Sequence, residues 1–319
     1  MRLNFTLAAA LLCAMLLSLL AGRHWIAPEV WLAGDLPSLI ITQLRLPRII
    51  LGALVGAGLG ISGAAMQGYL RNPLADPGLF GISACAALGA VLSIFFGLGG
   101  VPMALALCAL GGAGAGVALL MLLAGRSGSL ILFTLAGVML SSLAAALTAL
   151  VITLAPTPFA SAEIITWLMG ALTDRSWDDV LLALPLTAAG AALLFLTARR
   201  LDALSLGDLA ARSLGVDLPA LQRLLVIGLA LCVGGGVAVT GVIGFVGLMV
   251  PHLVRPLVGH RPSALMLPSA LAGALLVVVA DMAVRVAPLV NEVRLGVMMS
   301  VLGAPFFLML LLKMRRELA

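Results

Sequence analysis

One stretch decides the fold of this chain, residues 45–83, which read RLPRIILGALVGAGLGISGAAMQGYLRNPLADPGLFGIS. Its middle part, 49–70, carries no charged residue and is long enough to cross a bilayer, which takes about 20 apolar residues. Small residues recur there at every fourth position: Gly52, Gly56, Gly60, Ala64 and Gly68. This spacing places them on one helix face, where a second backbone can approach closely. The stretch therefore predicts a tightly packed membrane helix followed by a polar turn at 71–78.

The composition extends this prediction to the whole chain. Hydrophobic residues make up 63% of the 319 residues and charged residues 10%, whereas an average soluble domain has about 25% charged residues. A soluble core of this size could not bury so much apolar surface, so we expect a protein that crosses the membrane many times. The net charge of +5 comes from arginine, since Lys313 is the single lysine. Arginines beside membrane spans act as topology signals, and we expect no nucleic-acid partner.

Charge-free intervals predict an all-α membrane protein with about ten transmembrane helices in one domain, 1–319. The expected spans lie near 3–22, 49–70, 80–96, 102–124, 129–154, 180–198, 263–283 and 295–312, while 224–254 holds one full helix and a shorter one, separated near Thr240 and Gly241. If both termini are cytoplasmic, twelve of the 18 basic residues fall on the cytoplasmic side. Cytoplasmic loops are enriched in Lys and Arg, so we expect that orientation.

Two loops have helical patterns of their own. Residues 163–172 predict a short helix at the outer surface, and residues 199–222 predict a helical cytoplasmic segment. In the second loop one apolar face is formed at i, i+3, i+4 and i+8 by Leu206, Leu209, Ala210 and Leu214. Such a helix either anchors at the membrane surface or docks a soluble partner, and the pattern alone leaves both open.

The sequence carries no machinery for using ATP. A phosphate-binding loop ends in Gly-Lys-Ser/Thr, but the single lysine, Lys313, is followed by Met314. We therefore expect no catalytic residue and no cofactor or metal on this chain, with ATP and Mg bound by a partner subunit. The three histidines are scattered, and neither HExxH nor CxxC spacing occurs.

One ionisable residue inside a predicted span keeps a different energy source open. Asp281 could serve an ion-coupled secondary transporter, because charges within membrane spans mark ion pathways. Arg285 follows four residues later, however, where an i,i+4 pair neutralises the carboxylate, so we expect a structural pair. An enzyme acting inside the membrane is a more distant alternative, for which no catalytic arrangement stands out.

Four segments resemble the FecCD/BtuC-type permeases of bacterial ABC importers for iron chelates and cobalamin. They are the opening stretch, LSLGDLAARSLGV (204–216), GVIGFVGLMVPHLVRPLVGHRPSALMLPSALAGALLVVVAD (241–281) and EVRLGVMMSVLGAPFFLMLLLK (292–313). They follow family order from about residue 44 to the C terminus. The resemblance implies a type II importer permease with a BtuC-like fold, in the bacterial inner membrane.

The same resemblance implies partners and the residues that meet them. It implies a homodimer in the lipid bilayer, two ATPase subunits inside, and a periplasmic or lipid-anchored substrate-binding protein outside. The expected binding-protein contacts are Arg45, Arg48 and Arg285. The expected ATPase contacts lie in the segment at about 201–215 and in the turn after the second span: Asn72, Pro73, Leu74, Ala75, Asp76, Leu206, Gly207, Asp208, Ala211, Arg212, Leu214 and Gly215.

Two further expectations concern the pathway and its cargo. We expect Gly52, Gly56 and Gly60 to serve close helix packing and, with the other glycine clusters, a conduit of small side chains. Most family members carry iron chelates, so the resemblance favours siderophore-iron as cargo, with haem next and cobalamin third.

Overall fold

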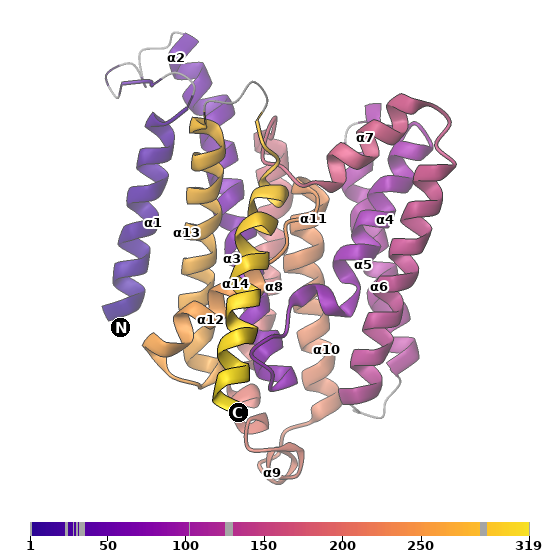
Figure 1. The fold of residues 1–319 in the computed structure, drawn as a ribbon, viewed down its shortest axis with the longest axis vertical. Helices are drawn as coiled ribbons and strands as arrows, with labels where there is room; N and C mark the ends of the chain where they lie inside the picture. The colour runs from indigo at the N-terminus through magenta and orange to yellow at the C-terminus, as the bar shows by residue number, and fades with distance from the viewer. Residues whose placement is uncertain are drawn as a thin grey trace.

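The computed structural model describes residues 2–22, 25–27, 29, 31, 36–101, 103–124, 130–287 and 292–318. Within these residues the chain is helical and has no strand. The long helices stand side by side in one bundle (Figure 1). Their bounds are α1 Arg2–Leu20, α3 Leu46–Leu70, α4 Ile82–Phe95, α5 Ala104–Ala124, α6 Leu130–Thr153, α8 Trp177–Leu204, α10 Leu218–Leu229, α11 Gly235–Thr240, α12 Val246–Val258, α13 Pro262–Val286 and α14 Leu295–Leu318.

The expected number of spans agrees with this architecture. Among the described residues eight helical runs are long and apolar enough to cross a membrane, and α4 and α12 are shorter apolar helices. Together they match the ten expected spans. The expected break near Thr240 and Gly241 is also present, because α10 and α11 form one continuous run that ends at Thr240 before α12 begins.

The second span begins earlier than its charge-free interval suggests. A short helix α2, Leu36–Leu39, leads through a π-helical turn, Ile40–Arg45, directly into α3. The helical run therefore starts at Leu36 and contains both Arg45 and Arg48. A charged residue usually marks the end of a span because burying it is costly. Here both arginines have partners inside the protein, so the helix continues through them.

The two helical loops also differ from expectation. α7, the helix expected at the outer surface, spans Pro158–Leu168 rather than 163–172, because the Thr157 hydroxyl caps its first turn by accepting from the Ala160 N–H at 3.1 Å. The segment 199–222, which was expected to be a helical cytoplasmic segment, is not one helix. α8 ends at Leu204, and only a short helix α9, Asp208–Ser213, precedes α10. Gly207 and Gly215 flank α9 with φ of +103° and +82°, a backbone region that interrupts a right-handed helix.

The glycine stripe of α3 packs against α13 within the same chain. A Cβ at Gly56 would collide with the carbonyl oxygen of Gly273, and one at Gly60 would collide with that of Ser269. A Cβ at Gly52 would lie 3.0 Å from the Leu172 side chain. Small residues let membrane helices approach closely and gain van der Waals contact. Gly56 and Gly60 therefore place α3 and α13 in direct backbone contact, which positions the charged residues at the α3 and α13 ends beyond them.

The bundle has two distinct ends. α9 and the C terminus lie at one end, which we call the α9 end, and α2 and α7 lie at the opposite end, which we call the α7 end (Figure 1). The residues expected to meet an ATPase gather at the α9 end, and those expected to meet a binding protein gather at the α7 end.

Candidate functional site

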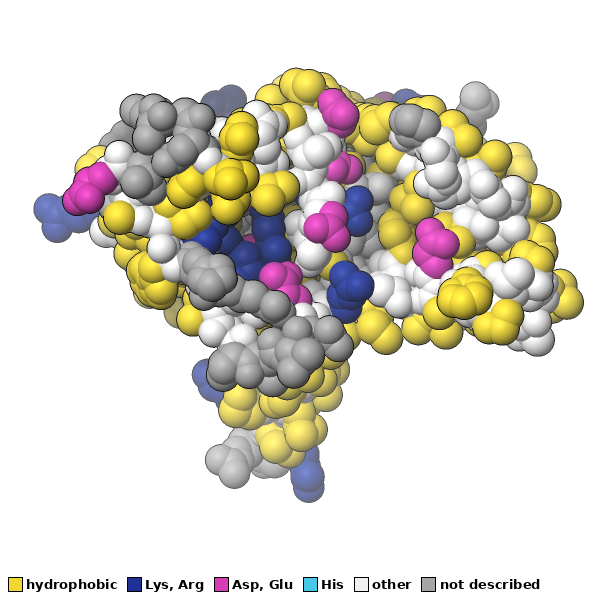
Figure 2. All heavy atoms as spheres, turned by 90° about the horizontal axis from the view of Figure 1, so that it is seen from above, with side chains coloured by type: hydrophobic (Ala, Val, Ile, Leu, Met, Phe, Trp, Pro, Cys, Tyr) yellow, Lys and Arg dark blue, Asp and Glu magenta, His cyan; other side chains and the backbone are white. Residues whose placement is uncertain are grey.

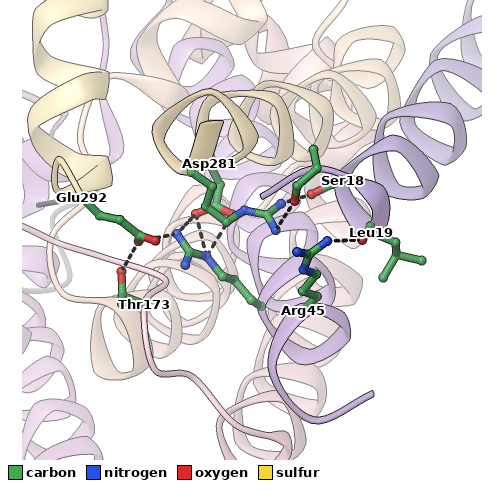
Figure 3. Close-up of polar contacts among 9 residues, drawn as sticks. Ser18, Leu19, Arg45, Thr173, Asp281 and Glu292 are labelled. Atoms are coloured by element: carbon green, nitrogen blue, oxygen red, sulfur yellow. Dashed lines mark hydrogen bonds and ion pairs between the residues drawn. The ribbon is translucent and has the colours of Figure 1, made fainter. Parts of the chain in front are cut away.

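Five charged side chains form a cluster at the α7 end, which we call the arginine cluster (Figure 3). Its members are Arg45, Arg48, Asp281, Arg285 and Glu292. At its centre, Arg48 forms an ion pair with Asp281. Arg48 Nη2 lies 2.8 Å from Asp281 Oδ1, and Arg48 Nε lies 3.0 Å from both carboxylate oxygens of Asp281. The side chains are only 11% and 3% exposed. A buried guanidinium–carboxylate fork of this kind is among the stronger polar contacts in proteins.

Arg48 also holds the segment that leads into α14. Its Nη2 lies 3.1 Å from Glu292 Oε2, and the Thr173 hydroxyl donates to the same oxygen at 3.1 Å. Partial burial opposes ionisation of Glu292, but the positive charge of Arg48 and the two hydrogen bonds prevail and lower the pKa of Glu292. One arginine of α3 thereby ties together α13, the start of α14 and the loop between α7 and α8.

The other two arginines hold the end of α1. Arg45 Nη1 donates to the carbonyl oxygens of Leu19 at 2.6 Å and Leu20 at 2.9 Å. Arg285 donates to the Ala21 carbonyl at 3.2 Å and to the Ser18 hydroxyl. The last carbonyls of a helix lack intrahelical donors and carry partial negative charge, which cations stabilise. Arg45 and Arg285 therefore act as the C-terminal cap of α1.

The expected pairing of Asp281 with Arg285 is confirmed, with Arg285 Nε 3.1 Å from Asp281 Oδ2. The pairing of the same carboxylate with Arg48 was not foreseen, because 233 residues separate the two in sequence. No local spacing rule detects such a contact. Asp281 thus lies between two guanidinium groups, in the interior of the bundle.

Of the three expected docking arginines, Arg45 and Arg285 are buried and Arg48 is partly buried, and all three border an open depression. A depression of about 350 Å³ is lined by Arg45, Arg48, Arg285 and Glu292, together with Asp174 and Arg175 from the loop before α8. Seen from the α7 end, basic side chains lie at the bottom of a hollow with acidic side chains beside it (Figure 2). With four arginines and two carboxylates, the lining is cationic. Any partner that contacts these arginines must place its group inside the depression.

At the α9 end, an ion pair joins the two segments expected to meet an ATPase. Arg71 Nη2 lies 2.9 Å from Asp208 Oδ1. Arg71 ends α3 with φ of +50°, and the Asn72 carboxamide oxygen then accepts from the Leu74 N–H at 2.9 Å. Asp76 Oδ1 accepts from the Gly78 N–H at 2.8 Å. The turn after α3 is thus held in shape by its own side chains and attached to α9.

The expected ATPase contacts divide into supporting and exposed residues. Ala75 and Ala211 are fully buried, Pro73 and Leu74 are half-buried, and Asn72 and Arg212 are exposed. The leucines of the expected apolar face do not pack on the chain: Leu206, Leu209 and Leu214 are 68%, 84% and 64% exposed. We call these three residues the leucine knob. Adjacent apolar side chains left uncovered at a helix are typical of an interaction surface.

A second polar feature at this end was missed by the sequence analysis. A cavity of about 430 Å³ is lined by Gln67, Gly68, Arg71, Asn72, Pro73, Ser205, His252, Arg255, His260, Pro262 and Leu265. Arg255 donates to the side-chain oxygen of Gln67, whose amide nitrogen donates to the Leu248 carbonyl at 3.3 Å. Arg71, which opens the polar turn, was the available signal for this region. In the part of the chain that the structure describes, no three His, Cys, Asp or Glu side chains form a potential metal site.

Comparisons with known proteins agree on one family. The model of the FecCD transport family matches residues 10–313. The vitamin B12 import system permease protein BtuC of Salmonella typhi is 39% identical over 315 residues, which cover 98% of this chain and 95% of that protein. BtuC of Salmonella typhimurium strain LT2 matches with the same identity and coverage.

Solved structures give the same picture. A protein assigned to the metal-chelate type of ABC transporters, solved in an inward-facing conformation, superposes with a TM-score of 0.89 at 31% identity and covers 98% of this chain and 99% of its own. PsaBC from Streptococcus pneumoniae, solved in complex with Fab, has a TM-score of 0.59 at 19% identity and covers 85% of this chain and 92% of its own. The second similarity concerns the fold alone.

Proposed function

The chain belongs to the FecCD transport family, and from that premise we propose that it is the permease of an ABC importer whose cargo is a corrinoid. The observation that carries the cargo assignment is the similarity to BtuC, a vitamin B12 import permease, at 39% identity over 98% of this chain. A ferric chelate is the second candidate. It is favoured by the similarity to a metal-chelate type transporter at 31% identity and was the first expectation from the sequence, with haem behind it.

We propose that the α9 end faces the cytoplasm of a bacterial inner membrane and receives the ATPase. The Arg71–Asp208 ion pair connects the turn after α3 to α9. A displacement of the leucine knob would therefore be transmitted to α3. α3 in turn packs on α13 through glycine. This series of contacts supports alternating access, in which two ATPase subunits close on ATP and Mg and move the helices of a permease homodimer. This chain itself supplies no cofactor and no catalytic group.

At the α7 end we propose that a substrate-binding protein docks over the cationic depression. Its acidic side chains would enter the depression and meet Arg45, Arg48 and Arg285, whose charge exceeds that of the neighbouring carboxylates. Complementary charge steers association and sets register more than it adds affinity. Since these arginines also hold α1 and α13, docking would pull on the same cluster that positions the outer helix ends.

The geometry gives little support to the ion-coupled alternative. Asp281 lies 2.8 Å from Arg48 and 3.1 Å from Arg285. Both oxygens of this carboxylate are engaged by guanidinium groups of the same chain, so they hold α3 and α13 together rather than offering a site for a transported ion. We therefore propose a structural role for Asp281.

A cargo competition in proteoliposomes tests the assignment. The permease is reconstituted with the ATPase and binding protein encoded beside it, and uptake of labelled cyanocobalamin is measured with excess unlabelled haem or ferric siderophore. We expect ATP-driven uptake that only unlabelled corrinoid reduces. Accumulation of the labelled siderophore or haem, with no accumulation of cyanocobalamin, would overturn the corrinoid assignment.

A further inference from the structure

A second depression at the α7 end has a different character from the cationic one. It has a volume of about 440 Å³ and forms where α7, the α7–α8 loop, the end of α11 and the start of α14 meet. Trp167 lines one side of this depression, which we call the Trp167 cavity. Its other lining residues are Ala162, Glu163, Thr166, Ala171, Thr173, Asp174, Arg175, Thr240 and Arg294. This volume falls in the range of small-molecule sites, about 300–1,000 Å³.

The Trp167 cavity offers both donors and acceptors without a net charge. Arg175 and Arg294 balance Glu163 and Asp174. Within the described residues, the side chains of Glu163, Asp174 and Arg294 make no hydrogen bond or ion pair, and Arg175 has only a 3.8 Å contact with Asp179. Three charged groups with no protein partner therefore border one cavity. The matching ligand group must both accept from a guanidinium and donate to a carboxylate.

Trp167 adds an apolar wall to this polar lining. The residue packs against two clusters of buried apolar side chains, one containing Ala238 and the other containing Ile164. The indole N–H is buried and has no hydrogen-bond partner among the residues that the structure describes, so the ring contributes its surface rather than a hydrogen bond. A flat apolar wall beside charged donors and acceptors suits the edge of a large ring that carries polar substituents.

We propose that the Trp167 cavity is the first contact site for the carboxamide-bearing edge of the cargo, and that it selects neutral amide groups over carboxylates. A primary carboxamide has one acceptor and two donors, so it satisfies Arg294 and Glu163 together. A carboxylate has no donor for Glu163 or Asp174 and would bring a third negative charge next to them. This inference rests on the proposed function, because it takes the cargo to be a corrinoid with peripheral amides.

The place of the cavity fits this role. Thr173, Asp174 and Arg175 border both the Trp167 cavity and the cationic depression where we propose that the binding protein docks. Cargo released from a docked binding protein would therefore meet the Trp167 cavity at once. Thr173 also donates to Glu292, so the loop that separates the two depressions is anchored to the arginine cluster.

The test compares two cargoes in the reconstituted complex of permease, ATPase and binding protein. One is cyanocobalamin, and the other is a cyanocobalamin derivative in which one peripheral amide has been hydrolysed to the acid. For Glu163→Gln and Arg294→Gln we expect the KM for cyanocobalamin uptake to rise about fivefold or more, since each loses a charged hydrogen-bond partner. Asp178→Asn, at an exposed acidic residue of α8 outside the cavity lining, is the matched control and should behave as wild type.

A charge reversal at Glu163 tests whether the cavity discriminates between amide and acid groups. Glu163→Lys turns the balanced lining cationic, so we expect the ratio of acid-derivative to cyanocobalamin uptake to rise about tenfold above wild type. An unchanged ratio in Glu163→Lys, together with wild-type KM values in the glutamine variants, would overturn the inference while leaving the importer assignment intact. If wild-type complex accumulates no corrinoid at all, the cargo assignment fails, and the inference fails with it.

Discussion

Arg48 Nη2 lies 2.8 Å from Asp281 Oδ1, so that α3 and α13 are joined by an ion pair between residues 233 positions apart in sequence. Below this pair, glycines of the two helices bring their backbones together. Beyond it, Arg285 connects α13 to the end of α1. The arginines at the α7 end are therefore part of the structure that holds the outer helix ends, and any partner that engages them acts on three helices at once.

Removing the shared carboxylate should destabilise the protein. Asp281→Ala leaves the buried guanidinium groups of Arg48 and Arg285 without their common counter-charge, and breaking a buried pair in this way costs about 3–5 kcal/mol. We expect a clear fall in the thermal unfolding temperature of the detergent-solubilised protein. Asp178→Ala, at an exposed position, is the control. Equal unfolding temperatures for Asp281→Ala and wild type would show that the pair does not stabilise the bundle.

The α3–α13 contact predicts opposite effects for two glycine-to-alanine changes. In Gly60→Ala the new methyl group collides with the Ser269 carbonyl, and overpacking of this kind costs about 1–3 kcal/mol. In Gly114→Ala, in α5, the methyl group meets open space, so the higher helix propensity of alanine should stabilise by up to about 1 kcal/mol. Thermal unfolding temperatures of Gly60→Ala and Gly114→Ala, compared with wild type, test both expectations. A neutral or stabilising Gly60→Ala would contradict the packing argument.

The leucine knob predicts a loss of association without a loss of stability. Leu209 is 84% exposed, so Leu209→Asp should change the free energy of unfolding by no more than about 0.5 kcal/mol. If the knob receives the ATPase, co-purification of that subunit should fall at least tenfold. Phe159→Asp places the same charge at an equally exposed apolar residue of the α7 end and should leave co-purification intact. Normal co-purification with Leu209→Asp would move the ATPase contact elsewhere.

The arginine cluster also predicts a pH dependence. Because Arg48 lowers the pKa of Glu292 below its ordinary value of 4.5, the ionised carboxylate stabilises the folded state above that pH. This contribution is lost as the pH falls through the lowered value. As the pH falls below 4.5, wild type should therefore lose stability more steeply than Glu292→Gln, which has no carboxyl group at position 292 to titrate. Parallel curves for the two proteins would show that the Glu292 contact contributes nothing.

Local sequence patterns predicted most of the helices, but they could not predict contacts between residues that are distant in sequence. Charge-free intervals located the spans, and i,i+4 spacing found the Asp281–Arg285 pair. The same charge rule placed the start of the second span too late, since Arg48 is neutralised by a residue that no local window contains. The apolar face at 206–214 was recognised but taken as part of a longer helix. Gly207 and Gly215 interrupt that helix and leave the leucines uncovered.

The cavities could not be foreseen for the same reason. The Trp167 cavity combines side chains from α7, the loop before α8 and the start of α14, and only the packed bundle brings Glu163 and Arg294 to one opening. Arg71, by contrast, was visible at the head of the polar turn. Its partner Asp208 was among the expected ATPase contacts, so the sequence pointed to one half of that ion pair.

The most direct test of the proposed importer function is to measure which energy source drives transport. Accumulation of labelled cyanocobalamin is followed in proteoliposomes that hold the permease, its ATPase and its binding protein, with ATP or a non-hydrolysable analogue inside and with or without a protonophore. We expect accumulation with ATP, unchanged by the protonophore, and no accumulation with the non-hydrolysable analogue. Accumulation that needs no ATP and collapses with the proton gradient would contradict this expectation and would make Asp281 the centre of the mechanism.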